Sequence, residues 1–378
     1  MKWEYKTLDQ LGIVSRGKSK HRPRNDPTLF GGEYPFIQTA DVKATPFYIS
    51  EYSATYNEKG LEQSKLWHAG TLCITIAANI ADTGILAMDA CFPDSVMGFV
   101  PYDEISDVRF VKYSFDILQA KCKKISQGTA QDNLSWEKLS TIQFPAPPFA
   151  TQKRIADILS TYDEMIENSQ KQIKLLEEAA HRMYKEWFVN LRFPGYENTE
   201  IVEGVPEGWQ QLLLDQVAPI LTGKKDANFS TINGQYPFFT CAQIPLQAPA
   251  YSFDCNAVIL AGNGDFNVKL YRGQFEAYQR TYVLSPKNEE MLFLLFHAVK
   301  TSMAKLAQGA SGSTIKFLTK GMIASIPVYV PDTLILKKFN EMSEAIQEQV
   351  ENLKSMIAHA TEDRDRLLPK LMGGEIEV

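Results

Sequence analysis

The feature that most constrains the fold of this chain is an internal repeat. Six residues near the N-terminus recur at an offset of 206: Trp3, Leu8, Asp9, Gln10, Gly17 and Lys18 return as Trp209, Leu214, Asp215, Gln216, Gly223 and Lys224. Residues 32–36 (GEYPF) return as 234–238 (GQYPF) at an offset of 202, and the pair 127–128 (QG) returns as 308–309 at an offset of 181. A chain that repeats itself is expected to fold into two similar units, and loop insertions explain the drift in offset.

Each repeated unit is followed by a long segment in which apolar residues are spaced alternately by three and four. The first runs from 151 to about 190 and contains Ile155, Leu159, Tyr162, Ile166, Ser169, Ile173, Leu176, Ala180, Met183 and Trp187. The second runs from 333 to about 371, with an expected stripe of Phe339, Met342, Ile346, Gln349, Leu353, Met356, Ala360, Asp363 and Leu367. This spacing is typical of coiled-coil seams, in which polar positions such as Ser169, Gln349 and Asp363 specify register.

Together these patterns predict a mixed α/β protein built from two tandem globular domains and two long helices. We expect the domains at 1–150 and 193–332, and the helices at 151–192 and 333–378 with a C-terminal tail. If a pseudo-twofold axis relates the repeats, the helices pack as an antiparallel coiled coil. The alternative is that each helix merely covers its own domain.

Composition favours a soluble globular protein. Of the 378 residues, 44% are apolar and 22% are charged, which argues against disorder. No apolar run reaches the length of a membrane span, and the N-terminal MKWEYKTLDQ has no signal-peptide core, so a cytoplasmic location is expected. Five cysteines form no C-x-x-C pair, and five histidines show no metal spacing, so no metal or other cofactor is expected.

The net charge of −6 does not exclude an anionic partner, because the acidity is concentrated in one segment. Residues 331–378 carry six basic and ten acidic side chains, whereas residues 1–150 carry sixteen and seventeen. The globular parts are therefore close to neutral, and local basic clusters are free to meet phosphate.

Residues 12–19 (GIVSRGKS) match the phosphate-binding loop pattern G-x-x-x-x-G-K-[ST]. That motif works only between an apolar strand and a helix, and here Pro23 and Pro27 would break the helix. The repeat places Ala218 at the position of Gly12 and Lys225 at that of Ser19, so the residue needed for magnesium is lost. We therefore expect no nucleotide site, but a shared strand, glycine turn and lysine.

The candidate DNA-binding residues are cations near these turns and polar side chains that follow the Tyr-Pro-Phe strands. Cations would contact phosphates, and amide or guanidinium groups would reach base edges, although exposed loops often carry such residues without any ligand. The candidates are Arg16, Lys18, Lys20, Arg22, Arg24, Gln38, Thr39, Lys224, Lys225, Thr240, Gln243, Lys269, Arg272 and Arg280.

Three stretches carry a family resemblance: residues 128–167 (GTAQDNLSWEKLSTIQFPAPPFATQKRIADILSTYDEMIE), 183–197 (MYKEWFVNLRFPGYE) and 363–378 (DRDRLLPKLMGGEIEV). The chain resembles the specificity subunit of bacterial type I restriction-modification enzymes over its whole length. The second helix matches less well, because it lacks the Gln-Lys-x-Ile opening and an aspartate at the position of Asp163.

The resemblance implies a non-catalytic subunit in which each globular domain reads one half of a bipartite, asymmetric DNA target. It also implies that the helices set the spacing and dock methyltransferase subunits, expected to number two, with restriction subunits as further partners. Tyr184, Trp187 and Phe188 are the candidate partner-binding residues; alternatively, their rings close the domain boundary. The competing hypothesis for the chain is a coiled-coil scaffold with protein-binding ends and no DNA role.

The residues themselves also argue against catalysis by this chain. Adenine methyltransferases need an Asn or Asp before Pro-Pro to accept the amino hydrogens, but the nearest string here begins with Ala146. Neither Pro93-Asp94 nor Pro331-Asp332 is followed by the Glu-x-Lys of a nuclease. We therefore expect methylation and cleavage to be the work of partner subunits.

Overall fold

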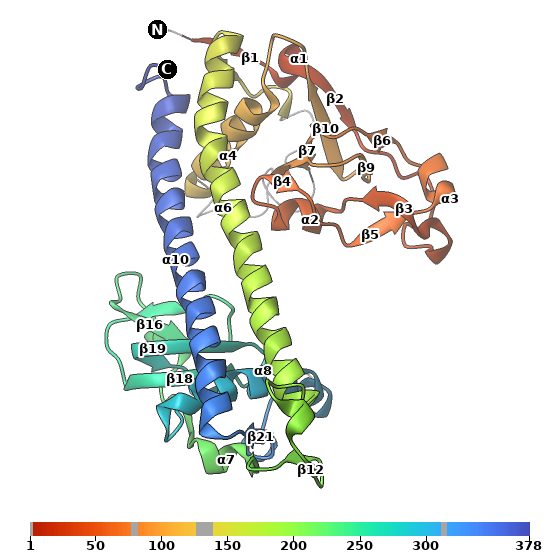
Figure 1. The fold of residues 1–378 in the computed structure, drawn as a ribbon. Helices are drawn as coiled ribbons and strands as arrows, with labels where there is room; N and C mark the ends of the chain where they lie inside the picture. The colour runs from red at the N-terminus through yellow and green to blue at the C-terminus, as the bar shows by residue number, and fades with distance from the viewer. Residues whose placement is uncertain (1–2, 77–81, 126–138, 311–315) are drawn as a thin grey trace. The chain divides into compact units, whose positions relative to one another are not determined.

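The structure, a computed structural model, describes residues 3–76, 82–125, 139–310 and 316–378 (Figure 1). Contacts divide the chain into two compact units, one formed by Met1–Lys171 with Leu353–Val378 and the other by Gln172–Asn352. Each unit has its own hydrophobic core and includes part of both long helices. The repeated pair 127–128 lies outside the described residues.

The first unit contains a five-stranded and a four-stranded sheet. The larger has the order β2 (Gly12–Arg16), β10 (Val96–Pro101), β7 (Leu72–Thr75), β8 (Thr83–Leu86) and β4 (Tyr48–Ile49). The smaller has the order β5 (Ala54–Tyr56), β3 (Phe30–Phe36), β9 (Ala90–Cys91) and β6 (Leu66–Trp67). A separate pair joins β1 (Glu4–Lys6) and β11 (Phe144–Ala146), and the helices are α1 (Leu8–Leu11), η1 (Pro27–Leu29), α2 (Thr39–Ala44), α3 (Glu58–Glu62) and α4 (Val108–Ile125).

The second unit is built around one six-stranded sheet. Its order is β15 (Ile220–Thr222), β20 (Thr281–Leu284), β18 (Phe253–Ala261), β19 (Val268–Ala277), β16 (Tyr236–Phe239) and β17 (Leu246–Ala248). Two strand pairs join β12 (Ile201–Val202) to β13 (Val205–Pro206) and β14 (Gln210–Leu213) to β21 (Pro327–Val330). The helices are α7 (Leu214–Val217), η3 (Tyr196–Asn198), η4 (Ala227–Phe229), η5 (Glu289–Met291), α8 (Leu292–Gly309) and α9 (Lys320–Ala324).

The predicted repeat is confirmed in three dimensions. The repeated Leu-Asp-Gln motif forms the short helices α1 and α7, because a glutamine side chain accepts a hydrogen bond at the start of each: Gln10 from the N–H of Thr7 at 3.0 Å, and Gln216 from that of Leu213 at 2.7 Å. α4 and α8 are related by an offset of 184 and span the same number of residues, and the same offset relates the first residues of α6 (Phe149–Tyr184) and α10 (Thr333–Met372).

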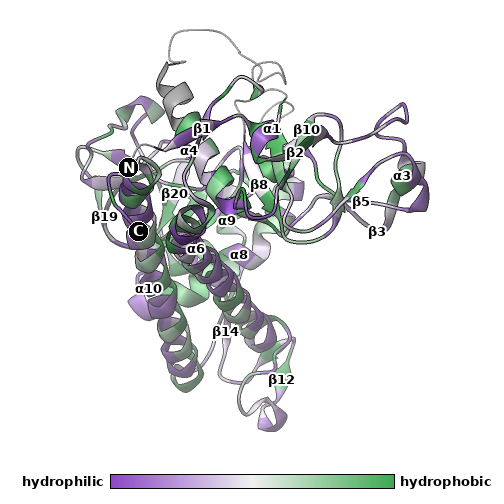
Figure 2. Ribbon diagram, turned by 90° about the horizontal axis from the view of Figure 1, so that it is seen from above, coloured by the Kyte–Doolittle hydropathy of each residue, from purple (hydrophilic) through white to green (hydrophobic). Residues whose placement is uncertain are grey.

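Two long helices complete the chain, α6 (Phe149–Tyr184) and α10 (Thr333–Met372), and a π-helical turn at Lys185–Val189 extends α6. In the first unit the beginning of α6 packs against the end of α10, where Ile155 and Leu159 share a core with Leu371 and Met372. In the second unit the end of α6 packs against the beginning of α10, and Phe188 lies 4.9 Å from Phe339 between ring centroids. The helices therefore run antiparallel within each unit, and both carry hydrophilic residues interspersed with hydrophobic ones (Figure 2).

The predicted seam of α6 is confirmed, since none of its ten residues is exposed. The predicted seam of α10 is wrong at four positions: Met342, Gln349, Met356 and Asp363 are exposed. The observed seam repeats that of α6 at the offset of 184, with steps of four before three. It consists of Phe339, Ser343, Ile346, Val350, Leu353, Ile357, Ala360, Arg364, Leu367 and Leu371, none of which is exposed.

Candidate nucleic-acid interface

The Gly-Lys turn of the first unit follows β2 and packs tightly on the turn that precedes β10. The N–H of Gly17 donates to the carbonyl of Val96 at 2.9 Å, and the N–H of Lys18 to that of Phe92 at 3.1 Å. A Cβ on Gly17 would lie 2.4 Å from the carbonyl oxygens of Phe92 and Pro93. The glycine is required because two backbone segments meet here, and residues 17–26 form no helix that could cradle phosphate.

The second unit builds the same contact from different residues. The N–H of Gly223 donates to the carbonyl of Thr281 at 3.2 Å, and a Cβ on this glycine would lie 1.9 Å from the carbonyl oxygen of Ala277. Lys225 and Tyr278 form an isolated parallel β-bridge through their backbones, and the carbonyl of Lys225 accepts from the N–H of Gln279 at 3.0 Å. Both units therefore hold a Gly-Lys turn against a second turn, here named the apposed turn: residues 93–96 in the first unit and 278–281 in the second.

In the part of the chain that the structure describes, the basic cluster of the first unit contains cations without an ion pair and cations that are held by carbonyl or carboxylate oxygens. Arg16 and Lys20 are exposed, and Lys18 is half-buried. Arg22 donates to the carbonyls of Ser19 at 2.7 Å and His21 at 2.8 Å.

Arg24 is held by a carboxylate of the apposed turn. Its Nη2 donates to both carboxylate oxygens of Asp94, at 2.7 and 2.9 Å, and Arg22 lies 3.8 Å from the same carboxylate. Arg24 is thus brought to the apposed turn in a fixed orientation, although its side chain is half exposed.

Arg24, Gln38 and Thr39 meet around a hollow of about 280 Å³, together with Phe30, Phe36 and Ser95. Gln38 lies at the start of α2, where its N–H donates to Asp41 at 2.7 Å and its Nε2 donates to Ser53 Oγ at 3.4 Å. In the sequence, Gln38 and Thr39 were grouped as candidates only because both follow the Tyr-Pro-Phe strand. The structure adds that Arg24 faces the same hollow.

In the second unit, Thr240, Gln243 and Lys269 belong to one polar network. Gln243 donates to Asp265 at 2.6 Å, Lys269 donates to the carbonyl of Ala242 at 2.9 Å and to Asn267, and Thr240 Oγ1 accepts from the N–H of Ala242 at 3.2 Å. Partial burial lowers the pKa of the Lys269 amine. The ammonium is therefore less well solvated than a surface lysine and responds more to added negative charge.

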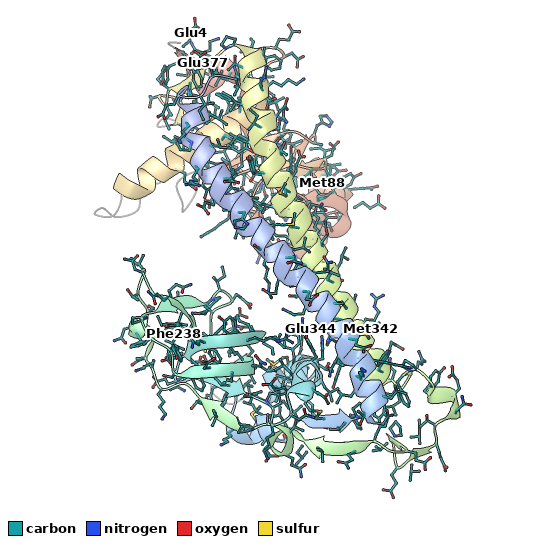
Figure 3. All side chains as sticks on the ribbon, turned by 60° about the vertical axis from the view of Figure 1, so that its left-hand side comes forward. Glu4, Met88, Phe238, Met342, Glu344 and Glu377 are labelled. Carbon is teal, nitrogen blue, oxygen red and sulfur yellow. The ribbon has the colours of Figure 1, made fainter. Side chains whose placement is uncertain are left out.

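The four remaining candidate cations of the second unit differ in their surroundings. Lys224 is exposed, whereas the Lys225 ammonium lies 4.4 Å from the ring centroid of Phe229. Arg280 is exposed on the apposed turn. Arg272 lies on β19 and not on the Gly-Lys turn or the apposed turn. Its guanidinium donates to both carboxylate oxygens of Glu344 on α10, at 2.6 and 2.7 Å (Figure 3 labels Glu344).

The Arg272–Glu344 pair is charged on both sides. Hydrogen bonds from Arg272 lower the pKa of Glu344, and the same bonds raise the pKa of Arg272. Such a bidentate pair fixes the planar guanidinium, so a DNA contact by Arg272 would first have to break it.

The aromatic candidates for partner binding differ sharply in exposure. Tyr184 is 3% exposed and Phe188 is 0% exposed, because both rings lie in the core of the second unit with Phe339 and Trp209. Trp187 is only partly buried against that core. The rings of Tyr184 and Phe188 are thus buried within the unit, and of the three rings only that of Trp187 is accessible to a partner.

Sequence reasoning missed three residues that lie beside these candidates. Lys65 donates to Ser15 Oγ at 3.4 Å on β2, and Asp94 and Ser95 form the tip of the apposed turn in the first unit. Lys65 is far from the basic run in sequence, and the apposed turns have different sequences in the two repeats. No local signal could have found them.

Among the described residues, no group of three or more His, Cys, Asp or Glu side chains could hold a metal ion. No helix among them is both long and apolar enough to cross a membrane. What the two units offer is cations, amides and hydroxyls on and around paired turns, a set suited to contacting an anionic polymer.

These features define a tandem-repeat protein with two polar turn regions and a pair of long helices. Comparison with known proteins gives its family: the family model described as "Type I restriction modification DNA specificity domain" matches residues 1–178 and 206–354. The chain belongs to this family, and the predicted resemblance is confirmed.

Individual relatives agree with this assignment. The chain is 37% identical over 179 residues to the specificity subunit of type I restriction enzyme EcoDI from Escherichia coli, a match covering 46% of this chain and 39% of that protein. It is 23% identical over 414 residues to the MjaIX specificity subunit from Methanocaldococcus jannaschii, covering 100% and 94%. The crystal structure of the type I restriction-modification S subunit from M. genitalium shares the fold, with a TM-score of 0.61 at 16% identity over 98% of this chain and 96% of that one.

Proposed function

We propose that this chain is the non-catalytic DNA-reading subunit of a type I restriction-modification system, and that each unit reads one half of a bipartite target. The observation that carries the proposal is the duplicated contact between a Gly-Lys turn and an apposed turn. In each unit this contact gathers cations and polar side chains in one place. Family membership supports the same role.

Within each unit we assign two kinds of DNA contact. The exposed cations, Arg16 and Lys20 in the first unit and Lys224 in the second, would neutralise phosphates together with half-buried Lys18. The amide and hydroxyl groups around the hollow and the polar network, among them Gln38 and Gln243, would face base edges. Phosphate contacts fix position and carry no sequence information, whereas base contacts do.

We further propose that the paired helices set the distance between the two reading units and dock two methyltransferase chains, with restriction subunits joining the assembly. α10 exposes two methionines, Met342 and Met356, and the π-helical turn that extends α6 carries partly buried Trp187. An adaptor that brings enzymes to DNA needs such a surface besides its DNA-binding side. In a bacterial cell this role places the chain in the cytoplasm.

Salt dependence of duplex binding tests the DNA role. Phosphate contacts release counterions, so the affinity of the assembly for duplex DNA should fall linearly on logarithmic axes with rising salt. Lys18→Ala and Lys224→Ala should each reduce that slope by about one and weaken binding to all sequences alike. Lys59→Ala, which changes an exposed lysine on α3, is the matched control and should leave the slope unchanged.

Two outcomes would contradict the proposal. Duplex binding without a salt slope would favour a protein-binding scaffold. ATP binding by the chain that Lys18→Ala abolishes would instead restore the phosphate-loop interpretation of residues 12–19.

A further inference from the structure

The two apposed turns occupy the same structural position, which the strand register establishes without reference to sequence. Phe36 pairs in parallel with Cys91, and Phe238 pairs in parallel with Glu276, at matching ends of the repeated Tyr-Pro-Phe strands. Counting on from these pairs, Pro93 corresponds to Tyr278 and Val96 to Thr281.

Two further sets of hydrogen bonds give the same correspondence. The N–H of Val96 donates to the carbonyl of Pro93 at 3.0 Å, and that of Thr281 donates to the carbonyl of Tyr278 at 2.8 Å. The carbonyls of Val96 and Thr281 each accept from the glycine of the Gly-Lys turn. Asp94 therefore corresponds to Gln279 and Ser95 to Arg280.

The backbone frame is thus shared by the two repeats, but the two side chains at the tip are not. In the second unit the tip carries an amide and a guanidinium; in the first it carries a carboxylate and a hydroxyl. The Gly-Lys turn beside each tip provides the cation that would bind a phosphate. A constant phosphate anchor next to a variable polar tip is the arrangement that reading of different sequences requires.

The second tip is built to present its side chains. The carbonyl of Arg280 accepts from the N–H of Gly262 at 2.9 Å and lies 3.7 Å from Cys241 Sγ, so the backbone is tied down while the side chain stays exposed. Gln279 is also exposed, and its Nε2 donates to Asp226 Oδ1 at 3.4 Å. A fixed backbone under exposed side chains lowers the cost of ordering those side chains on a ligand.

The first tip presents its donor indirectly. Asp94 itself is engaged by the guanidinium of Arg24, which projects from the neighbouring loop to the hollow lined by Gln38 and Ser95. Asp94 therefore acts on Arg24 as a positioning residue, and a guanidinium again stands at the tip.

We propose that base reading in each unit is organised by the apposed turn: Arg280 with Gln279 on that turn reads one half of the target, and Arg24, held against that turn by Asp94, takes part in reading the other. This rests on the proposed function. Arginine recognises guanine through two parallel hydrogen bonds in the major groove, and glutamine recognises adenine in the same way. Each half-target should therefore contain a guanine read by an arginine, and the half read by the second unit should carry an adenine next to it.

The test replaces Arg280 by the residue that stands at the corresponding place in the first unit. Arg280→Ser should relax the preference for guanine at one position by roughly 5- to 150-fold. The other half of the target and the gap should not change. The readout is selection of bound duplexes from a randomised library by the complete assembly, together with sequencing of the adenines that it methylates.

Arg192→Ser is the matched control, because it makes the same change at an exposed arginine of the same unit. It should leave the selected sequence unchanged. If Arg280→Ser proves unfolded by its thermal transition, Gln279→Asp tests the adjacent position, where the preference should shift from adenine toward cytosine. In the first unit, Asp94→Asn should relax one guanine position of the other half-target while overall DNA binding persists.

The outcomes separate this inference from the proposed function. A folded Arg280→Ser assembly that selects the original sequence, or one that loses both halves of the target together, overturns the reading role of the turn. In the first of these outcomes the salt-dependent duplex binding survives, and the proposed function stands. Loss of that binding from the unaltered assembly would instead overturn the proposed function.

Discussion

At the scale of single residues, the close contact at each Gly-Lys turn explains why the repeat keeps a glycine there. Neither Gly17 nor Gly223 has a positive φ, so neither is needed for backbone freedom. They are needed because a carbonyl oxygen lies where a Cβ would be, at 2.4 Å for Gly17 and 1.9 Å for Gly223. The Gly-Lys turn and the backbone segment packed against it must therefore move apart when either glycine gains a side chain.

The first prediction follows from this contact. Gly17→Ala should lower the free energy of unfolding by about 1–3 kcal/mol, because backbone rather than a flexible side chain would have to move. Gly321→Ala is the control: Gly321 is an exposed helical residue, and a Cβ added to it would have no neighbouring atom within 4 Å. Alanine there should be neutral or stabilising by up to about 1 kcal/mol. Urea unfolding measures both, and equal effects would contradict the contact.

A second prediction concerns the buried histidine His297. Burial, followed by the nearby charges of His181 and Lys300, lowers its pKa from 6.5 to about 3. As the pH falls below about 6.5, His297 becomes protonated in the unfolded chain but stays neutral in the folded chain. The stability due to neutral His297 is therefore complete above that pH and is lost toward pH 3, at up to about 1.4 kcal/mol per pH unit.

His297→Phe should flatten this dependence, which unfolding measured at about pH 7 and about pH 5 would reveal. His359→Phe changes an exposed histidine on α10 and should keep the slope of the unaltered chain. The lowered pKa of His181 acts in the same direction, so some slope should persist in the His297 variant. A slope that is identical in all three proteins would rule out the assigned role of His297.

At the scale of elements, the heptad pattern predicted both long helices but chose the wrong seam on the second. In α10, Met342 and Met356 are as apolar as the residues that are buried, and the true seam includes Ser343 and Arg364. Hydrophobicity alone therefore favoured the stripe with Met342 and Met356 over the stripe that is buried. The offset of 184 that links the two seams follows from α4 and α8, but the residues on these elements differ too much for sequence alone to reveal it.

Arg364 shows why a charged residue can occupy a seam. Its Nη1 donates to Asp163 at 2.6 Å, and Asp163, only 5% exposed, also accepts from the hydroxyl of Tyr113 at 2.5 Å. Burial opposes the charge on Arg364, but the carboxylate of Asp163 raises its pKa above the usual value. The aspartate that the second helix lacks is thus the anchor of a cluster joining α4, α6 and α10 in the first unit.

The third prediction removes this anchor's partner. Arg364→Ala would leave Asp163 buried without its counter-charge, and the free energy of unfolding should fall by about 3 kcal/mol. Arg366→Ala breaks an exposed pair with Glu362 on the same helix and should cost less than about 1 kcal/mol. Thermal or urea unfolding of the two variants compares a buried with an exposed ion pair. Similar losses would show that the cluster contributes no more than surface charge does.

At the scale of the whole molecule, the sequence predicted two repeats and two helices, and it identified the family from residues 128–167, 183–197 and 363–378. It did not predict that each compact unit would include part of both helices, because that depends on contacts between residues about 200 positions apart, such as Asp163 with Arg364. Nor did it predict the apposed turns, which share backbone geometry without sharing sequence. Sequence similarity reveals the framework that the two repeats share. The tips of the apposed turns differ in sequence, so their correspondence is seen only from the strand register.

The last prediction treats the paired helices as the ruler that sets the gap between half-targets. A heptad inserted after Ile166 in α6, with a second after Ala360 in α10, keeps both seams in phase and adds about 10 Å at about 1.5 Å per residue. The unspecific gap should lengthen by about three base pairs, while the half-targets stay the same. Four-residue insertions at the same sites add about 6 Å and act as stutters that the seam can absorb, so the gap should grow by about one or two base pairs. Methylation sequencing reads both results, and an active assembly whose gap is unaltered by the heptads would mean that something other than these helices positions the reading units.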